Sequence, residues 1–246
     1  MPEIHPTAVV EDGAVLGEGV VVGPLCFVGP HAQLGAGTRL VSHVSVLGRT
    51  TLGANNVVWP QSVLGGDPQD LKYRGEPTTL EIGDSNDIRE CVTMNLGTEN
   101  GGSVTRVGNN NLIMAYSHVG HDCIIGSHCI LANSLQLAGH ILIEDHANIG
   151  GATAIHHYVT VGQYSFVGGM TRVVHDVPPF MIVEGNPSRV RGVNIIGMRR
   201  HQYPDENIDA LKRAWRVLYK NQPGENGVVH TTAEGLDQVE DEFGDD

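Results

Sequence analysis

Aromatic side chains are scarce in this chain: they make up 5% of its 246 residues, although 40% of the residues are hydrophobic. Such a chain can bury a core, but one built from aliphatic side chains rather than rings. No apolar run approaches the ~20 residues that span a bilayer. The first ten residues, MPEIHPTAVV, also lack the basic and apolar regions of a secretory leader. We therefore expect a cytoplasmic protein with no stable membrane insertion.

Cysteine is also rare, and its spacing excludes the common metal and disulfide frameworks. The four cysteines, Cys26, Cys91, Cys123 and Cys129, form no CxxC pair. Three of them occupy a small inward position of the repeat described below. We expect buried structural thiols, with no metal or other cofactor held by them.

Basic residues are outnumbered, and the formal net charge of -13 argues against a nucleic-acid partner. Much of this charge comes from one end of the chain, because residues 221–246 hold eight acidic side chains and neither Lys nor Arg. We expect residues 223–246 to form an acidic, disordered tail that says little about an active surface.

A six-residue repeat runs through most of the chain. From Ile4 to Leu64, from Ile82 to Met94 and from Val107 to Val173, every sixth residue is apolar, at 26 positions without a polar exception. A glycine often follows, as Gly23 and Gly120 do, and we expect it to turn a corner near a left-handed backbone conformation. Four residues after each aliphatic side chain comes a mostly small one. Two inward positions per six residues predict one short strand per hexapeptide.

This pattern resembles the hexapeptide-repeat acyltransferases. The resemblance implies an all-β left-handed parallel β-helix, a triangular prism with three hexapeptides per coil, in which residues eighteen apart are vertical neighbours. We expect the prism to span residues 1–186, with extruded loops near 65–81 and 95–106. The first of these keeps the phase of the repeat, which suggests that it replaces one coil. A small α-helical region should occupy residues 187–222, with Ile208, Leu211, Trp215 and Leu218 on one face and Pro204 near its start.

Outward-facing histidines form the densest group of chemically capable residues. The segments SHVGHDC, AGH and AIHHY contribute His118, His121, Asp122, His140, His156 and His157. Because 140 − 122 and 139 − 121 both equal 18, regular coils would stack Asp122 under His140 and His121 under Gly139, with His157 in the same column as His121. A histidine beside a carboxylate suits a general base, and a glycine amide can bind an oxyanion. No Ser or Cys nucleophile motif accompanies them, which favours acyl transfer without a covalent intermediate.

Seven successive segments resemble the UDP-N-acetylglucosamine O-acyltransferase family of lipid A biosynthesis: IHPTAVVEDGA, DPQDLKYRGEPT, SHVGHDC, LANSLQLAGH, GGATAIHHY, DVPPFMIVEGNP and GVNIIGMRR. The resemblance implies a homotrimer that moves a 3-hydroxyacyl chain from acyl carrier protein to UDP-N-acetylglucosamine, without a cofactor. It makes His121 the base, Asp122 its orienting group and Gly139 the oxyanion donor. It assigns substrate contacts to Asp70, Lys72, His118, His140, His156, Asn194 and Arg200, and acyl length to Gly169. We place His157 with the substrate-binding residues because of its column.

Three positions depart from the family pattern, and the sequence leaves several functions open. Ile196 replaces an acidic ribose contact, His201 replaces an arginine, and Leu96 replaces a basic loop residue. Asp70 and Lys72 could be a solvated loop pair, Arg200 part of an exposed helix face, and Gly169 a turn residue. The HxxH spacing of His118 and His121 is also compatible with zinc in a γ-class carbonic anhydrase. The same repeat would suit an acyltransferase that acts on another sugar, an amino sugar or serine, and it would suit a non-catalytic scaffold.

Overall fold

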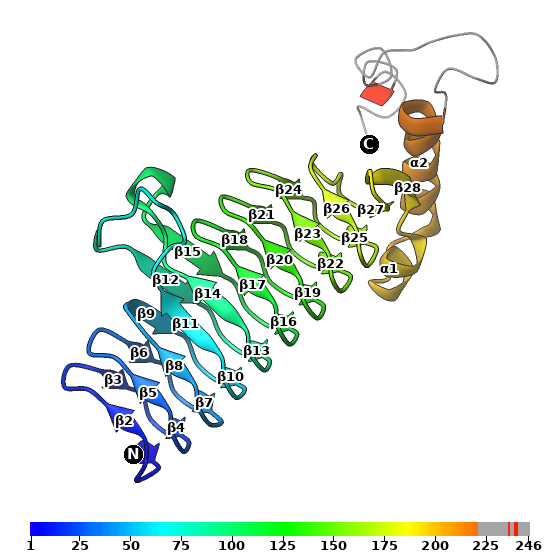
Figure 1. Ribbon diagram of the computed structural model, residues 1–246. Coiled ribbons are helices and arrows are strands. Elements are labelled where there is room, and N and C mark those ends of the chain that lie inside the picture. The colour runs from blue at the N-terminus through cyan, green and yellow to red at the C-terminus, as the bar shows by residue number, and fades with distance from the viewer. Residues whose placement is uncertain (221–235, 237–238, 241–246) are drawn as a thin grey trace.

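The protein is a three-sided prism followed by a short helical segment. The computed structural model describes residues 1–220, 236, 239 and 240. Three parallel sheets form the faces, and the chain visits the first, second and third face in turn as it climbs, in a left-handed β-helix (Figure 1). The expected fold class is therefore confirmed.

Most strands are only two residues long. The first face contains β1 (Glu3–Ile4), β4 (Val21–Val22), β7 (Arg39–Leu40), β10 (Val57–Val58), β13 (Asp87–Ile88), β16 (Leu112–Ile113), β19 (Ile130–Leu131), β22 (Asn148–Ile149), β25 (Phe166–Val167), β27 (Met181–Glu184) and β28 (Arg189–Val193). The second contains β2 (Val9–Val10), β5 (Phe27–Val28), β8 (Ser45–Val46), β11 (Val63–Gly66), β14 (Thr93–Asn95), β17 (His118–Val119), β20 (Gln136–Leu137), β23 (Ala154–Ile155) and β26 (Arg172–Val173). The third contains β3 (Val15–Leu16), β6 (Gln33–Leu34), β9 (Arg49–Leu52), β12 (Thr79–Ile82), β15 (Val104–Val107), β18 (Ile124–Ile125), β21 (Leu142–Ile143) and β24 (Thr160–Val161).

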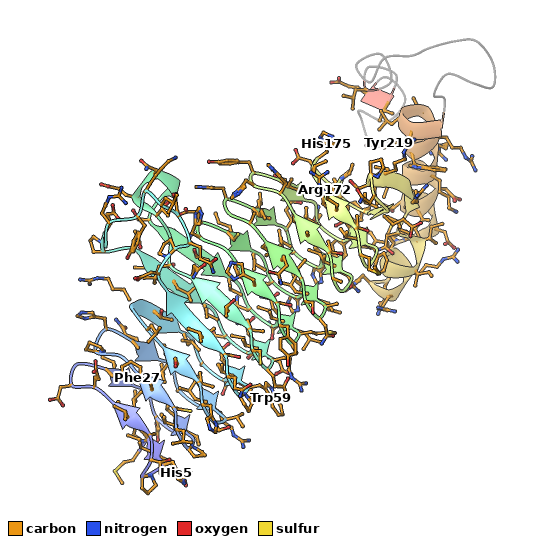
Figure 2. All side chains as sticks on the ribbon, in the orientation of Figure 1. His5, Phe27, Trp59, Arg172, His175 and Tyr219 are labelled. Atoms are coloured by element: carbon orange, nitrogen blue, oxygen red, sulfur yellow. The ribbon has the colours of Figure 1, made fainter. Side chains whose placement is uncertain are left out.

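The six-residue repeat builds the core because it points one aliphatic side chain per strand inward. Val119 pairs with Leu137, and Leu137 with Ile155, so each step between coils is eighteen residues. All three side chains are at most 2% exposed. Ile4 is 46% exposed, since no coil lies beneath the first one. The main core cluster of the described residues contains no aromatic side chain. Phe27 and Trp59 lie on the outside (Figure 2).

A ladder of asparagines lines one inner corner, where the sequence led us to expect small side chains. The Asn86 backbone and side-chain N–H groups donate to Oδ1 of Asn56 at 2.9 and 3.0 Å. Oδ1 of Asn86 accepts from the backbone N–H of Asn111 at 2.9 Å, and Oδ1 of Asn111 accepts from that of Cys129 at 2.7 Å. Asparagine is favourable at a position where the repeat usually has a small side chain, because its Oδ1 accepts from a backbone N–H that would otherwise be buried without a partner. As expected, Cys26, Cys123 and Cys129 are buried at this inward position, and burial raises the pKa of the Cys123 and Cys129 thiols to about 12. Cys91 is only partly buried, so the expectation of a buried thiol was wrong for this residue.

The corner glycines have a different cause from the one we expected. Gly23 and Gly120 do not adopt positive φ, whereas Leu25 and Asp122, two residues later in each case, do, with φ of 57° and 60°. A Cβ on Gly120 would overlap the carbonyl oxygen of Ala138 in the next coil. At these two corners glycine is therefore required by the close approach of stacked coils, and most left-handed positions of the described residues carry side chains.

Both irregular loops project from the corner between the second and third faces, which we call the loop corner (Figure 1). The first lies between β11 and β12, and the second, which includes the 3₁₀ turn Glu99–Gly101, lies between β14 and β15. The first loop does not replace a coil, and that interpretation was wrong. Ile82 pairs with Leu52, so this coil is thirty residues long (82 − 52 = 30) instead of eighteen and carries the loop as an insertion.

The C-terminal segment covers the last coil. β27 and β28 pair antiparallel, and α1 (Ile195–Arg200) and α2 (Asp205–Trp215) follow, with a π-helical turn at Arg216–Lys220. Ile208 is buried against Met181, Val193 and Met198, which confirms the expected helix and its apolar face. No helix in the described residues is long and apolar enough to cross a membrane. The acidic tail predicted for residues 223–246 lies outside the described residues, apart from residues 236, 239 and 240, and the predicted domain boundaries stay predictions.

The asparagine ladder should be a main source of stability. Asn86→Ala leaves the buried N–H of Asn111 without its acceptor and removes the side-chain donor to Oδ1 of Asn56, whereas the backbone N–H of residue 86 remains. An unsatisfied buried polar group costs about 1–3 kcal/mol, so the free energy of unfolding should fall by roughly 3 kcal/mol in chemical denaturation followed by circular dichroism. Asn133→Ala, at an exposed turn position, is the control. Equal stability of the two variants would show that the ladder is dispensable.

Candidate active site

His121 and Asp122 form a buried pair at the loop corner. Nδ1 of His121 lies 2.7 Å from Oδ2 of Asp122. A carboxylate only accepts, so Nδ1 carries the proton and Nε2 presents its lone pair. Asp122 is 5% exposed and His121 is 8% exposed. The pair is thus arranged as a general base whose tautomer is fixed by its partner.

The second loop holds Asp122 in place through a residue that the sequence did not point to. Oδ1 of Asp122 accepts from the backbone N–H of Thr98 at 2.7 Å, and Oδ2 accepts from its hydroxyl at 2.6 Å. The Asp122 backbone N–H donates to the Thr105 hydroxyl at 2.8 Å. A Cβ on Gly101 would overlap the carboxylate, so the backbone of this loop packs directly against it. The only signal in the sequence is that Thr98 lies in the second loop, two residues after Leu96.

The coil above brings Gly139 and His140 over this pair, as the eighteen-residue spacing predicted. A Cβ on Gly139 would lie 2.7 Å from Cε1 and 2.9 Å from Nε2 of His121, so only glycine leaves room for the ring. Nε2 of His140 lies 3.7 Å from Oδ2 of Asp122. The His140 ring stacks on Tyr158 at 4.5 Å between centroids.

A cleft of about 320 Å³ opens beside His121 on the second face. It is lined by Gln69, Asn95, His118, Gly120, His121, Gln136, Leu137, Ala138, Ala154, Ile155 and His157. Burial lowers the pKa of His118, and the nearby His121 lowers it further. Burial also lowers the pKa of His140, opposed by Asp122. Both imidazoles are therefore neutral at pH 7 and can accept or donate hydrogen bonds.

The first loop brings Asp70 toward the same histidines. Oδ1 of Asp70 accepts from the backbone N–H of Lys72 at 2.9 Å. This hydrogen bond is the main reason that the pKa of Asp70 is lowered. The charge of Lys72 acts in the same direction, as do those of His121 and His140 in their protonated forms. Asn95, which is 6% exposed, also lines the cleft, and its Oδ1 has no partner among the described residues. Asn95 is a second residue to which the sequence assigned no role.

His156 and His157 are both exposed, at the upper end of this group. Nδ1 of His157 accepts a hydrogen bond from the backbone N–H of Gly139 at 3.1 Å. The His157 ring centroid is 6.4 Å from that of His121 and 5.5 Å from that of His156. The structure therefore brings together His118, His121, Asp122, Gly139, His140, His156 and His157, with Asp70 and Lys72 on the adjacent loop.

Asn194 and Arg200 lie elsewhere. They line a separate cleft of about 370 Å³ at the corner between the third and first faces, where His128, His146, Tyr164 and Phe180 stack (the stacking corner). The side chain of Asn194 caps α1 by accepting from the N–H of Gly197 at 3.0 Å. Among the described residues, none lines both this cleft and the His121 cleft.

The departures from the family pattern have structural counterparts. Leu96 is 4% exposed and packs in the core, where a Cβ on Gly48 would meet it at 2.8 Å. Ile196 is 76% exposed. His201 packs edge-on against His146 at 4.8 Å between centroids. Gly169 is exposed and stacks over Gly151, outside both of these clefts, and its role in acyl length stays a prediction.

Comparison with known proteins identifies the family. The family described as UDP-N-acetylglucosamine O-acyltransferase, domain 2, matches residues 176–245, and the bacterial transferase hexapeptide matches residues 105–138. LpxA from Acinetobacter baumannii is 40% identical over 98% of this chain and 90% of its own, with a TM-score of 0.92. The chain belongs to the UDP-N-acetylglucosamine O-acyltransferase family.

Two further members show the breadth of the family. UDP-N-acetylglucosamine O-acyltransferase from Moraxella catarrhalis is 37% identical over 98% of this chain and 92% of its own, with a TM-score of 0.89. UDP-N-acetylglucosamine acyltransferase from Arabidopsis is 34% identical over 97% and 89%, with a TM-score of 0.85. The resemblance found in the sequence is therefore confirmed.

These relatives do not support the interpretation of the site as a zinc carbonic anhydrase. His121, Asp122 and His140 do offer ligand atoms within 4.8 Å of one another. However, both oxygens of Asp122 already accept hydrogen bonds from Thr98, and Oδ2 also faces Nδ1 of His121. The contacts match a carboxylate that is held by the loop and orients an imidazole. They match less closely an open zinc site, which keeps a position for water.

Thr98 should act by positioning. Thr98→Val keeps the shape of the side chain but removes the hydroxyl that donates to Asp122, whereas Thr98→Ser retains it. Because misplacement by about 1 Å can cost ~10²-fold in rate, we expect Thr98→Val to lower the kcat of acyl transfer by at least tenfold, with KM little changed. Thr98→Ser should retain most of the activity. Equal kcat values for the two variants would show that the Thr98 hydroxyl does not contribute to the reaction.

Proposed function

We propose that the enzyme transfers a 3-hydroxyacyl chain from an acyl carrier protein thioester to the 3-hydroxyl of UDP-N-acetylglucosamine, the first step of lipid A biosynthesis, in the cytoplasm. Family membership supports the sugar nucleotide and the acyl transfer. The observation that carries the proposal for this site is the buried His121–Asp122 pair beneath the Gly139 amide.

In this reaction Nε2 of His121 removes the proton from the sugar 3-hydroxyl as its oxygen attacks the thioester carbonyl carbon. The carbonyl oxygen becomes an oxyanion, which accepts a hydrogen bond from the backbone N–H of Gly139. Collapse of the tetrahedral intermediate breaks the C–S bond, and the protonated His121 returns its proton to the departing carrier thiolate. Asp122 stabilises the transient imidazolium, because its carboxylate faces Nδ1 at 2.7 Å.

Further residues hold the substrates. Asp70 and Lys72 on the first loop contact the sugar, with His118, His140, His156 and His157 around it. The unpartnered Oδ1 of Asn95 is suited to accept from a substrate N–H or hydroxyl. Asn194 and Arg200 contact the nucleotide, with the guanidinium of Arg200 matching a diphosphate.

Such a substrate needs a second copy of the chain. The His121 cleft opens on the second face, and the Arg200 cleft opens at the stacking corner. The two clefts share no lining residue, so one copy does not present them as one continuous site. Packing the stacking corner of one copy against the second face of another would join them, and three copies in a ring would close the arrangement. This separation supports a homotrimer with active sites between adjacent prisms.

Activity should depend on His121. Purified protein incubated with UDP-N-acetylglucosamine and 3-hydroxyacyl carrier protein should form the 3-O-acyl product, detected by mass spectrometry. Because a positioned general base contributes roughly 10²–10⁴ in rate, His121→Ala should lose at least a hundredfold in kcat/KM while remaining folded. His31→Ala, an exposed histidine in the first coils, is the control. Product formation by folded His121→Ala at the wild-type rate would contradict the role of the base.

The shared site can be tested by complementation. His121→Ala and Arg200→Ala should each be inactive alone, since each breaks every site of its own trimer. Mixed trimers, formed by denaturing and refolding the two proteins together, should regain activity, because some sites then combine an intact His121 from one copy with an intact Arg200 from its neighbour. If refolded mixtures contain mixed trimers but stay inactive, the two clefts do not form one site.

A further inference from the structure

At the stacking corner, backbone amides of the turns are capped by side chains from the coil above. The N–H of Ser127 donates to Oδ1 of Asp145 at 2.7 Å, and the N–H of Asn109 donates to Oγ of Ser127 at 3.0 Å. Further down, the N–H of Asp84 donates to Oδ1 of Asn109 at 2.7 Å. The caps are carboxylate, amide and hydroxyl oxygens, and they satisfy amides that the coil-to-coil ladder leaves unpaired.

At the loop corner, the corresponding amide is that of Gly139, and its cap is an imidazole. Nδ1 of His157 accepts from this N–H at 3.1 Å, a longer contact than the oxygen caps of the stacking corner. Acceptance requires Nδ1 to be unprotonated, so the proton of the neutral ring is on Nε2. His157 is exposed in the single chain and lines the cleft, so its ring has room to swing into it.

The Gly139 amide lies beside the reacting groups. Its N–H donates to Nδ1 of His157, and the His157 ring lines the same cleft as His121. A Cβ on Gly139 would lie 2.9 Å from Nε2 of His121, so the Cα of Gly139 also lies against the base. An N–H makes one strong hydrogen bond at a time. If this N–H stabilises the oxyanion, it cannot at the same moment donate to His157. The bond to His157 must therefore form before the oxyanion and break when it appears.

We propose that His157 is a positioning residue that caps the Gly139 amide in the free enzyme and yields it to the oxyanion during acyl transfer. This inference rests on the proposed function, because it takes the Gly139 amide as the oxyanion donor. The cap keeps a buried amide satisfied and aimed into the cleft when no substrate is bound. An imidazole on an exposed side chain releases the amide, whereas an oxygen cap of the kind found at the stacking corner would compete with the oxyanion.

The test compares a fixed cap with no cap. His157→Asn introduces an amide oxygen of the kind that caps Asp84 from Asn109, without adding charge next to His121. His157→Ala removes the cap. Because loss of one oxyanion donor costs about 10²–10³ in kcat, kcat of His157→Asn should lie at least tenfold below that of His157→Ala. The effect of His157→Ala should fall mainly on KM. His175→Asn, an exposed histidine at the end of the prism, is the matched control (Figure 2).

Hydrogen exchange at the Gly139 amide, resolved to single residues by mass spectrometry, measures the cap directly and without substrate. Exchange should be slow in wild type and His157→Asn and at least tenfold faster in His157→Ala. An exchange rate in His157→Ala equal to that of wild type would show that His157 does not cap the amide. A kcat for His157→Ala equal to or below that of His157→Asn would show that release of the amide does not matter for the reaction. If wild type transfers no acyl chain, the proposed function fails and the release fails with it, while the exchange rates still decide whether His157 caps the amide.

Discussion

Every other feature of the prism depends on the hydrogen bonding between successive coils. A strand of two residues has almost no stability alone, and it is held because its N–H and C=O groups pair with the coils above and below at a fixed offset. This offset makes residues such as Val119, Leu137 and Ile155 stack in one column. It also brings corner backbones so close that Gly120 has no space for a Cβ beside Ala138. The interior that remains is narrow, which is why rings such as those of Phe27 and Trp59 are outside.

The same hydrogen bonding between coils determines where the chain can carry catalytic groups. A coil can lengthen only at a corner, where inserted residues leave the register unchanged, and both insertions occur at the loop corner. They therefore lie below Asp122 and His140, which are one and two coils above the second loop. The second loop supplies Thr98 to the carboxylate of Asp122, so the base depends on a residue that the regular repeat could not provide. The prism gives the column its spacing, and the loops give it burial and polar partners.

The sequence predicts well wherever the repeat is uninterrupted. Gly139 over His121 and His140 over Asp122 follow from subtraction alone, because the coils from residue 119 to residue 155 each contain eighteen residues. Thr98 could not be found in this way, since it reaches Asp122 through a loop whose path the spacing does not determine. The asparagine ladder was missed for another reason. Asn86 occupies a position where the repeat predicts a small side chain. Only the unpaired backbone amides of the next coil make an asparagine favourable there. The glycines were recognised but explained wrongly, because a repeat shows where glycine recurs and not which atom excludes a Cβ.

A scaffold locked in this way has no hinge near the chemistry, so changes in hydrogen bonding during the reaction fall to side chains and loops. The backbone of Gly139 is fixed by coils on both sides: its carbonyl accepts from the N–H of Tyr158 at 3.3 Å, and the next residue, His140, donates to the carbonyl of His121 at 3.0 Å. An oxyanion donor held so firmly costs little reorganisation when charge develops, which is the property that makes such donors effective. The same rigidity means that the amide cannot turn away from an unwanted partner. Whatever satisfies it between turnovers has to move instead, and among its neighbours an exposed imidazole at position 157 is a group with the freedom to do so.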